Sequence, residues 1–161
     1  MAGKQNTYRK KTRELFMRLV FQMMATGDWS EDAADLFLGD DSLWSGNPRA
    51  GEPVGALFDK AAGEKPDLPY IGAGLDALRE HLHEIDDAIE GASEKWRISR
   101  MAGVDLAILR VAIAELRYLD TIDGRVSINE AVELAKKYGS AKSPAFVNGI
   151  LGKVAAREEG L

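Results

Sequence analysis

Residues 127–139 have the sequence SINEAVELAKKYG, which predicts a short amphipathic helix with both ends marked. Ser127 and Glu130 have the spacing of a capping box, in which the hydroxyl and the carboxylate each bond a backbone N–H at the helix start. Gly139 is expected to take the left-handed conformation that often ends a helix. The expected apolar stripe of this helix consists of Val132, Ala135 and, at its end, Tyr138.

Residues 143–151, SPAFVNGIL, predict a second helix. Ser143 is expected to cap it, with Pro144 at the first helical position, where a missing N–H costs nothing. Phe146 and Asn148 fall within about a turn and a half of the helix start, close to unpaired N–H groups that favour anions. Phe146 is placed at the edge of the inward stripe, where partial exposure is expected; the stripe consists of Val147, Ile150, Leu151 and Val154.

The longer segments of the remaining chain also predict helices. Over residues 70–91, leucines and isoleucines at steps of three and four predict a helix with one buried stripe. Over residues 104–119, apolar residues leave little polar face, so this helix is expected to be the buried centre of the fold. A first helix is predicted over residues 8–26, ended by Gly27. The main polar exits of the central helix are expected to be Arg110, Glu115 and Arg117.

Two shorter segments have less regular patterns. An amphipathic fragment over residues 32–38 is expected to bury Leu36 and Phe37, and a loop is expected over residues 45–55. A short helix over residues 53–62 is predicted from the apolar positions Val54, Leu57, Phe58 and Ala61. The chain therefore predicts an all-α fold, in one domain or in two small helical subdomains that share a core.

Charge is distributed unevenly along the chain. Residues 1–13 carry five basic residues and no acid, whereas the other 148 residues carry 16 basic and 26 acidic side chains. The formal net charge of −5 therefore combines a basic N-terminal arm at 1–13 with an acidic body. This pattern is consistent with a localised polyanion site. From charge alone, a solvated terminal tail is the better interpretation, because short terminal basic runs are common.

Several kinds of site are not indicated. The chain has no cysteine, so disulfides and thiolate chemistry are excluded. His81 and His83 point about 200° apart on a helix, so they cannot chelate one metal ion together. No glycine spacing fits a phosphate-binding loop, no serine lies in a nucleophile elbow, and no buried carboxylate pair is indicated, so we expect no enzyme activity and no cofactor. No apolar run approaches the ~20 residues of a membrane span and no signal segment is seen, so a cytoplasmic location is expected.

Binding chemistry is better supported than catalysis. Four basic residues near the N-terminus span about one helical turn and can contact a phosphate backbone at several points: Arg9, Lys10, Lys11 and Arg13. Phe146, beside Lys142 and Ser143, has the character of a platform for an unstacked base of single-stranded RNA. A core position for Phe146 is an equally good interpretation, because aromatic residues at helical spacing are usually packed.

These segments closely resemble the NusB family of bacterial transcription antitermination factors. The resemblance is strong over residues 94–156 and weaker over residues 8–26, and residues 27–70 do not align. It extends to whole phrases: INEAVELAKKYG at 128–139, FVNGIL at 146–151, VDLAILRVAIAEL at 104–116, WRISRM at 96–101, and REL followed by VF at 13–21.

The resemblance implies a compact all-α bundle of about six to seven helices, with two small helical subdomains around a shared central helix, over a single domain 1–161. It also implies binding of boxA-type RNA together with NusE, a small-subunit ribosomal protein, and loading onto elongating RNA polymerase with other Nus factors, chiefly at ribosomal RNA operons. The RNA-binding positions that it implies are Arg9, Lys10, Lys11, Arg13, Lys142, Ser143 and Phe146.

Two further positions match the surface that the family uses for NusE. Phe21 stands where the family usually has Tyr, so a hydroxyl is lost, and Asp105 stands where an acid is expected. After Ile122 the family often has proline, and its absence here alters loop rigidity more than binding. Two other functions remain open: an RNA-binding module associated with an RNA methyltransferase, and a helical protein-interaction adaptor without RNA binding. The absence of a Gly-rich cofactor segment argues against the methyltransferase role.

Overall fold

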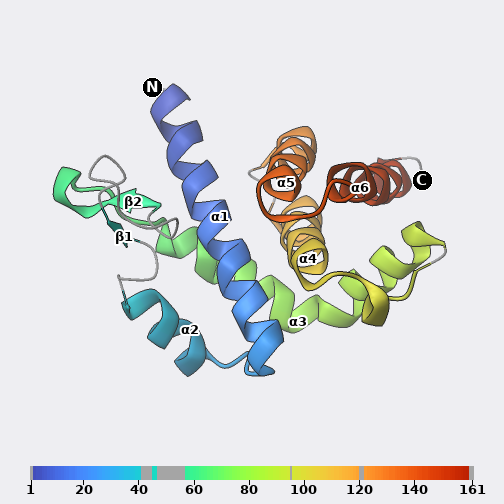
Figure 1. Cartoon of the computed structure of the whole chain (residues 1–161), viewed down its shortest axis with the longest axis horizontal. Coiled ribbons are helices and arrows are strands. Elements are labelled where there is room, and N and C mark those ends of the chain that lie inside the picture. The colour runs from blue at the N-terminus through green and yellow to red at the C-terminus, as the bar shows by residue number, and fades with distance from the viewer. Residues whose placement is uncertain (1, 41–44, 47–56, 95, 120–121, 160–161) are drawn as a thin grey trace. The chain divides into compact units, whose positions relative to one another are not determined.

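A computed structural model describes residues 2–40, 45–46, 57–94, 96–119 and 122–159 (Figure 1). These residues form six α-helices, two 3₁₀ helices and one pair of two-residue strands, so the predicted all-α class is confirmed. The chain divides into two compact units, Met1–Ile71 and Gly72–Leu161. Each unit is described by itself.

The first unit is built on α1 (Ala2–Thr26), which begins six residues before the predicted start. Its apolar face is buried, with Phe16 lying edge-on to Tyr70 at a ring-centroid distance of 5.9 Å. Gly27 ends α1 as predicted: its φ is +74°, and its N–H donates to the Met23 carbonyl at 2.8 Å. The buried face of α1 includes Leu15, Phe16, Leu19, Val20 and Met23.

The next helix is α2 (Glu31–Gly39), whose start is capped by Ser30 because the hydroxyl accepts the Ala33 N–H at 3.1 Å. Phe37 is buried as expected. The expectation for Leu36 was wrong, since this side chain is 78 % exposed. The two residues are adjacent on a helix, about 100° apart, so the single face that α2 buries accommodates Phe37 and leaves Leu36 outside.

The helix predicted over residues 53–62 is also wrong for its described part, and residues 53–56 lie outside the described residues. Strand β2 (Phe58–Asp59) pairs in parallel with β1 (Ser45–Gly46), and a single 3₁₀ turn, Lys60–Ala62, follows. Asp59 caps that turn by accepting the Ala62 N–H at 3.2 Å, and Gly63 ends it at φ +80°. Leu57 and Phe58 are buried, so the apolar signal was correct and its periodicity was misread.

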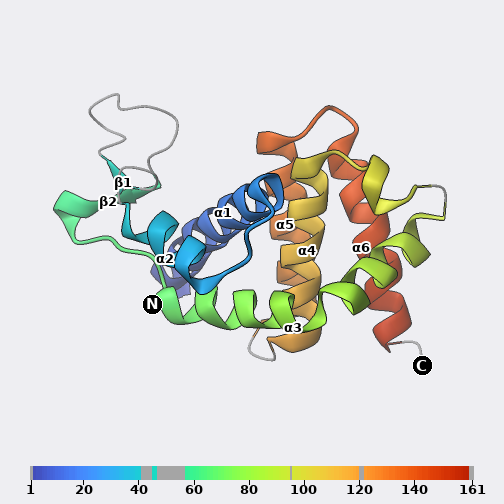
Figure 2. The ribbon, with the colours of Figure 1, turned by 90° about the horizontal axis from the view of Figure 1, so that it is seen from below.

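The second unit contains most of α3 (Leu68–Ser93), a 3₁₀ turn (Ile98–Arg100), α4 (Gly103–Tyr118), α5 (Gly124–Tyr138) and α6 (Ser143–Glu159). Helices α4, α5 and α6 pack against one another (Figure 2). Every residue of α4 from Asp105 to Glu115 is buried, so its predicted central position is confirmed. In α3, His81 departs from helical geometry (φ −120°, ψ 21°) and marks a kink.

Two of the three residues expected as polar exits of α4 are instead paired inside the fold. Arg110 is buried and forms a bidentate pair with Asp86 of α3, with both N–O distances at 2.9 Å. Glu115 is fully buried and accepts a hydrogen bond from the Ser127 hydroxyl of α5 at 2.7 Å. These polar groups tie α4 to its neighbours, because a buried charge is tolerated only when it is paired.

The pairing of Ser127 also corrects the predicted start of α5. No capping box forms at Ser127 and Glu130, because the helix begins at Gly124 and is capped by Asp123, whose Oδ1 accepts the Arg125 N–H at 2.9 Å. Ser127 lies one turn inside the helix. The buried face of α5 consists of Ser127, Ala131, Leu134 and Ala135, with Val132 and Tyr138 only partly buried.

The turn between α5 and α6 differs from the prediction at two residues. Gly139 ends α5, but its φ of −92° is not left-handed. Glycine is needed there because a Cβ would collide with the Ser143 hydroxyl oxygen. That hydroxyl accepts the Ser140 N–H at 2.9 Å, while the Phe146 N–H bonds to the Lys142 carbonyl at 3.1 Å. Ser143 is therefore the first residue inside α6 and not its cap.

Candidate nucleic-acid interface

The predicted cations at the start of α1 differ in exposure. Lys10 is exposed, Arg9 and Lys11 are half-buried, and Arg13 is only 3 % exposed. Thr12 is fully buried, and its hydroxyl accepts the Asp67 N–H at 3.2 Å. Residues 8–13 are thus part of the folded first unit. Of these four cations, Lys10 has the most solvent-exposed side chain.

Two of these cations, Arg9 and Lys11, form ion pairs with acidic residues of the segment before α3. The Arg9 guanidinium lies 3.4 Å from Asp67 Oδ2 and 4.5 Å from the centre of the Tyr70 ring. The Lys11 Nζ lies 2.8 Å from Glu64 Oε1. A phosphate that binds here meets side chains already held in position, but it also competes with their carboxylate partners.

Tyr8 is a candidate that our sequence reasoning missed. It is exposed beside Arg9 and lies edge-on to Phe58, with ring centroids 6.5 Å apart. Partial burial, and then the nearby Asp67 carboxylate, raise the pKa of the Tyr8 hydroxyl, so the phenol stays neutral and can donate a hydrogen bond. The signal was present in the sequence, where an aromatic residue directly precedes the basic run Arg9-Lys10-Lys11.

A second set of predicted residues lies at the start of α6 in the second unit. Lys142 is exposed and Phe146 is partly exposed, while Ser143 between them is buried. Lys142 and Phe146 are four residues apart at the helix start, so they lie on the same side of α6. The predicted inward stripe is confirmed, since Val147, Ile150, Leu151 and Val154 are all buried.

The two positions predicted for a protein partner have opposite exposures. Phe21 on α1 is a large exposed aromatic residue. Asp105, in the first turn of α4, is 8 % exposed, and its Oδ1 is buried with no hydrogen-bond partner among the described residues. A buried acceptor that lacks a donor costs about 1–3 kcal/mol, so the isolated chain leaves this carboxylate incompletely satisfied.

The described residues contain no cluster of three or more His, Cys, Asp or Glu side chains that could hold a metal ion. His81 stacks on Tyr118 with ring centroids 4.0 Å apart, and His83 lies 3.3 Å from Asp87. The two histidines thus have different neighbours. Among the described residues, no helix is both long and apolar enough to cross a membrane.

The described residues form a small all-α protein with exposed basic side chains on α1 and directly before α6. The chain belongs to the NusB family, whose model matches residues 10–156. It is 38 % identical over 148 residues to the transcription antitermination protein NusB of Clostridium botulinum (strain Kyoto / Type A2), covering 91 % of this chain and 98 % of that protein.

Two solved structures support the same assignment. NusB of T. maritima is 31 % identical in sequence and superposes with a TM-score of 0.66. The superposition covers 91 % of this chain and 89 % of the T. maritima chain. A chain from the crystal structure of antitermination factors NusB and NusE in complex with dsRNA is 25 % identical, with a TM-score of 0.67 and coverages of 93 % and 97 %.

Proposed function

We propose that this protein is a transcription antitermination factor. It binds boxA-type single-stranded RNA together with NusE and loads onto elongating RNA polymerase in the cytoplasm, chiefly at ribosomal RNA operons. The observation that carries the proposal is the match to the NusB family over residues 10–156, joined to the likeness to a chain from a crystal structure of NusB and NusE in complex with dsRNA.

The proposed RNA contacts are of two kinds, ionic contacts to phosphates and stacking of a base on an aromatic ring. Lys10 and Lys142 are exposed and engage phosphates directly, with Arg9 and Lys11 adding to the basic surface of α1. Phe146 supplies a partly exposed ring on which a base stacks. Stacking favours an unpaired strand, because the bases of an A-form duplex have no free faces.

The two buried members of the predicted RNA-binding set act indirectly in this proposal. Ser143 holds the Ser140 N–H through its hydroxyl, and so fixes the turn that carries Lys142 into α6. Arg13 is assigned a supporting role within the first unit, since its side chain is buried. Both are positioning residues and not direct RNA contacts.

NusE is assigned to two positions, Phe21 in the first unit and Asp105 in the second. An exposed aromatic ring and a carboxylate oxygen without a donor are both features that a protein partner satisfies. RNA and NusE bind at the same time, and each strengthens the binding of the other by the same factor, as linked sites must. The role is one of binding, and no catalytic step is assigned.

A titration of labelled boxA RNA tests this function. Fluorescence anisotropy would be measured with the full chain, with and without NusE, and with a scrambled RNA of the same length and composition as the control. We expect weak binding of boxA RNA by the chain alone and markedly tighter binding with NusE. Equal affinity for the boxA and scrambled RNAs, or an affinity that NusE leaves unchanged, contradicts the proposal.

A further inference from the structure

The turn between α3 and α4 presents an exposed tryptophan that is followed by two exposed arginines. The Trp96 side chain is 50 % exposed, and Arg97 and Arg100 are exposed on the same short segment. Among the described residues, none forms an ion pair with either guanidinium. We call this set of three residues the Trp96 surface, and none of the roles assigned above uses it.

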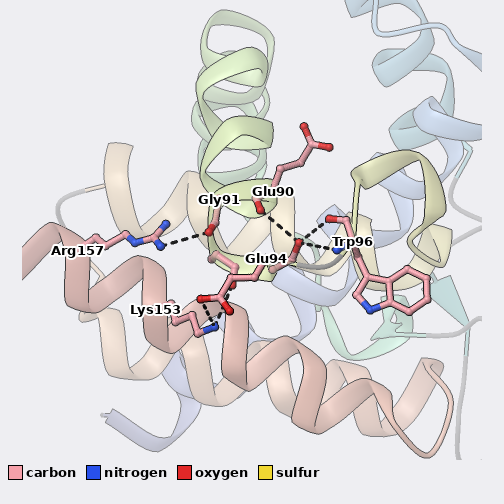
Figure 3. Close-up of polar contacts among 8 residues, drawn as sticks. Glu90, Gly91, Glu94, Trp96, Lys153 and Arg157 are labelled. Atoms are coloured by element: carbon pink, nitrogen blue, oxygen red, sulfur yellow. Dashed lines mark hydrogen bonds and ion pairs between the residues drawn. The ribbon is translucent and has the colours of Figure 1, made fainter.

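The backbone that carries the indole is ordered by two side chains of α3. The Ser93 hydroxyl donates to the Trp96 carbonyl and accepts the Trp96 N–H at 3.3 Å (Figure 3). One turn earlier, a Glu90 carboxylate oxygen accepts the Ile98 N–H at 3.1 Å. The ring is thus exposed on a fixed support, which reduces the entropy lost when a ligand stacks on it.

The end of α3 is itself held from α6. Glu94 has a φ of +60°, a left-handed conformation that is strained for a residue with a Cβ. Lys153 pairs with Glu94 at 3.3 Å and donates to the Ala92 carbonyl at 3.3 Å, and Arg157 donates to the Gly91 carbonyl at 3.2 Å (Figure 3). These cations occupy carbonyls that a helix end leaves unpaired.

Figure 3 also shows the direction in which the indole is presented. Trp96 lies on the side of the α3 end away from Lys153 and Arg157. The cations that stabilise the helix end therefore do not cover the ring. The left-handed conformation of Glu94 turns the chain at the end of α3, directly before the exposed Trp96. Backbone strain of this kind often occurs at functional sites.

The two arginines are spaced by one 3₁₀ turn. The Arg100 N–H donates to the Arg97 carbonyl at 2.9 Å, and the Met101 N–H to the Ile98 carbonyl at 3.1 Å. Because a 3₁₀ helix has three residues per turn and a rise of about 2.0 Å per residue, Arg97 and Arg100 lie on one side, ~6 Å apart along the axis. Two neighbouring guanidinium groups beside an exposed indole suit single-stranded nucleic acid, in which bases that can stack alternate with phosphates that arginine can bind.

We propose that the Trp96 surface is a second RNA contact, which binds single-stranded RNA flanking the boxA element. Trp96 stacks on an unpaired base, while Arg97 and Arg100 engage adjacent phosphates. The inference rests on the proposed RNA-binding function and extends it to a new position. A protein partner is less well matched, because three of the four residues that follow the indole, Arg97, Ser99 and Arg100, are exposed and polar. Ile98, the apolar residue among them, is only partly exposed and does not make an extended apolar contact surface.

Three RNAs test the proposal: the boxA element alone, and the same element with an unstructured single-stranded flank on its 5′ or its 3′ side. Wild-type protein should bind one flanked RNA more tightly than the element alone. Trp96→Ala should lower the affinity for that flanked RNA by about 5- to 150-fold, the range for one lost stack. Affinity for the element alone should stay within about twofold, and Trp96→Phe, which keeps a flat ring, should retain most of the flank effect.

The arginines give an independent readout through salt. The double variant Arg97→Gln, Arg100→Gln should reduce the slope of log K against log salt by ~1.4 on the flanked RNA only, at ~0.7 per phosphate of a single strand. Arg125→Gln is the matched control, because its side chain is 91 % exposed at the start of α5 and lies beyond the opposite end of α4. Melting temperatures of all variants are compared, so that loss of fold is not taken for loss of contact.

Two results overturn the inference. In the first, Trp96→Ala binds both flanked RNAs as the wild type does. In the second, Trp96→Ala weakens NusE binding and leaves every RNA affinity unchanged, which makes the surface a protein contact. Failure of the proposed function gives a different result, in which the wild-type protein binds boxA and a scrambled element with equal affinity. The contribution of Trp96 is still measured in that case, as the difference in affinity between the short and the flanked RNA.

Discussion

Replacing two exposed lysines by glutamine isolates the electrostatic part of RNA binding. Lys10 lies near the start of α1 and Lys142 directly before α6, and both are exposed. Glutamine removes the charge and keeps a long polar side chain. Because neither lysine is buried, each substitution should change the free energy of unfolding by no more than about 0.5 kcal/mol.

The expected loss of affinity follows from counterion release. Each phosphate contact on a single strand contributes ~0.7 to the slope of log K against log salt. Relative to 1 M salt, one lost contact therefore weakens binding about fourfold at ~0.15 M salt and about eightfold at ~0.05 M. The double variant Lys10→Gln, Lys142→Gln should lose ~1.4 of the slope and about 15-fold in affinity at ~0.15 M.

Anisotropy titrations of labelled boxA RNA at several salt concentrations measure both quantities. Arg125→Gln, which also removes one exposed positive charge, is the control for net charge alone. We expect its slope to equal that of the wild type. A double variant with an unchanged slope would refute the assignment of Lys10 and Lys142 to phosphate contacts, and an equal drop in Arg125→Gln would show that total charge is responsible.

Substitution is preferable to removing residues 1–13 because of how the start of α1 is built. Thr12 and Arg13 are buried, Arg9 packs on Tyr70, and Lys11 pairs with Glu64. Deleting this segment removes part of the first unit together with its charges. A truncated chain should therefore melt at a lower temperature, and its RNA affinity would not report on phosphate contacts alone.

Four further predictions concern single residues. Phe146→Ala should weaken boxA binding by about 5- to 150-fold with little change in melting temperature; a stability loss of ~3–5 kcal/mol with unchanged RNA affinity of the folded protein would mean that the ring is a core residue. Asp105→Asn should weaken NusE binding about tenfold or more in a calorimetric titration while the protein stays folded, and normal binding would end its assignment to the partner surface. Ser127→Ala leaves the buried Glu115 without one donor, so urea unfolding should show a loss of ~1–3 kcal/mol, whereas a neutral effect would show that the carboxylate is satisfied elsewhere. Glu94→Gly should raise stability by about 1 kcal/mol, since glycine adopts a positive φ without strain, and a destabilised variant would show that the ion pair with Lys153 outweighs the strain.

The existence of the long helices could be predicted from sequence, but their polar details could not. Apolar residues at steps of three and four place α3 correctly, because periodicity reports which face is buried. The lack of a polar face places α4 at the centre, and the inward stripe of α6 is also correct. The capping role given to Ser127 failed because its hydroxyl bonds Glu115, which lies 12 residues earlier on another helix. Ser143 failed for a related reason, since its hydroxyl is taken by the Ser140 N–H. A local motif identifies a donor or acceptor, and tertiary packing decides its partner.

The same limit applies to the predicted site. The run of lysines and arginines indicated a basic surface on α1, and in the structure the Lys10 side chain is exposed. The partners of Arg9 and Lys11, in contrast, are Asp67 and Glu64, more than 50 residues further along the chain. Residues 27–70, which include these acids, are also where the family resemblance gave no alignment. Sequence reasoning therefore found the charges but missed the groups that partly neutralise them.

The two units should consequently contribute differently to RNA recognition. In the first unit the cations of α1 share their charge with nearby acids, so their contribution is electrostatic and falls steeply as salt rises. In the second unit α4 is tied to α3 through Arg110 and Asp86, and to α5 through Glu115 and Ser127. In the proposals above, the aromatic residues of this unit, Phe146 and Trp96, should contribute stacking, which salt affects little. Affinity that persists at high salt should therefore depend on the aromatic residues of the second unit, whereas the salt-sensitive part should be divided between the cations of both units.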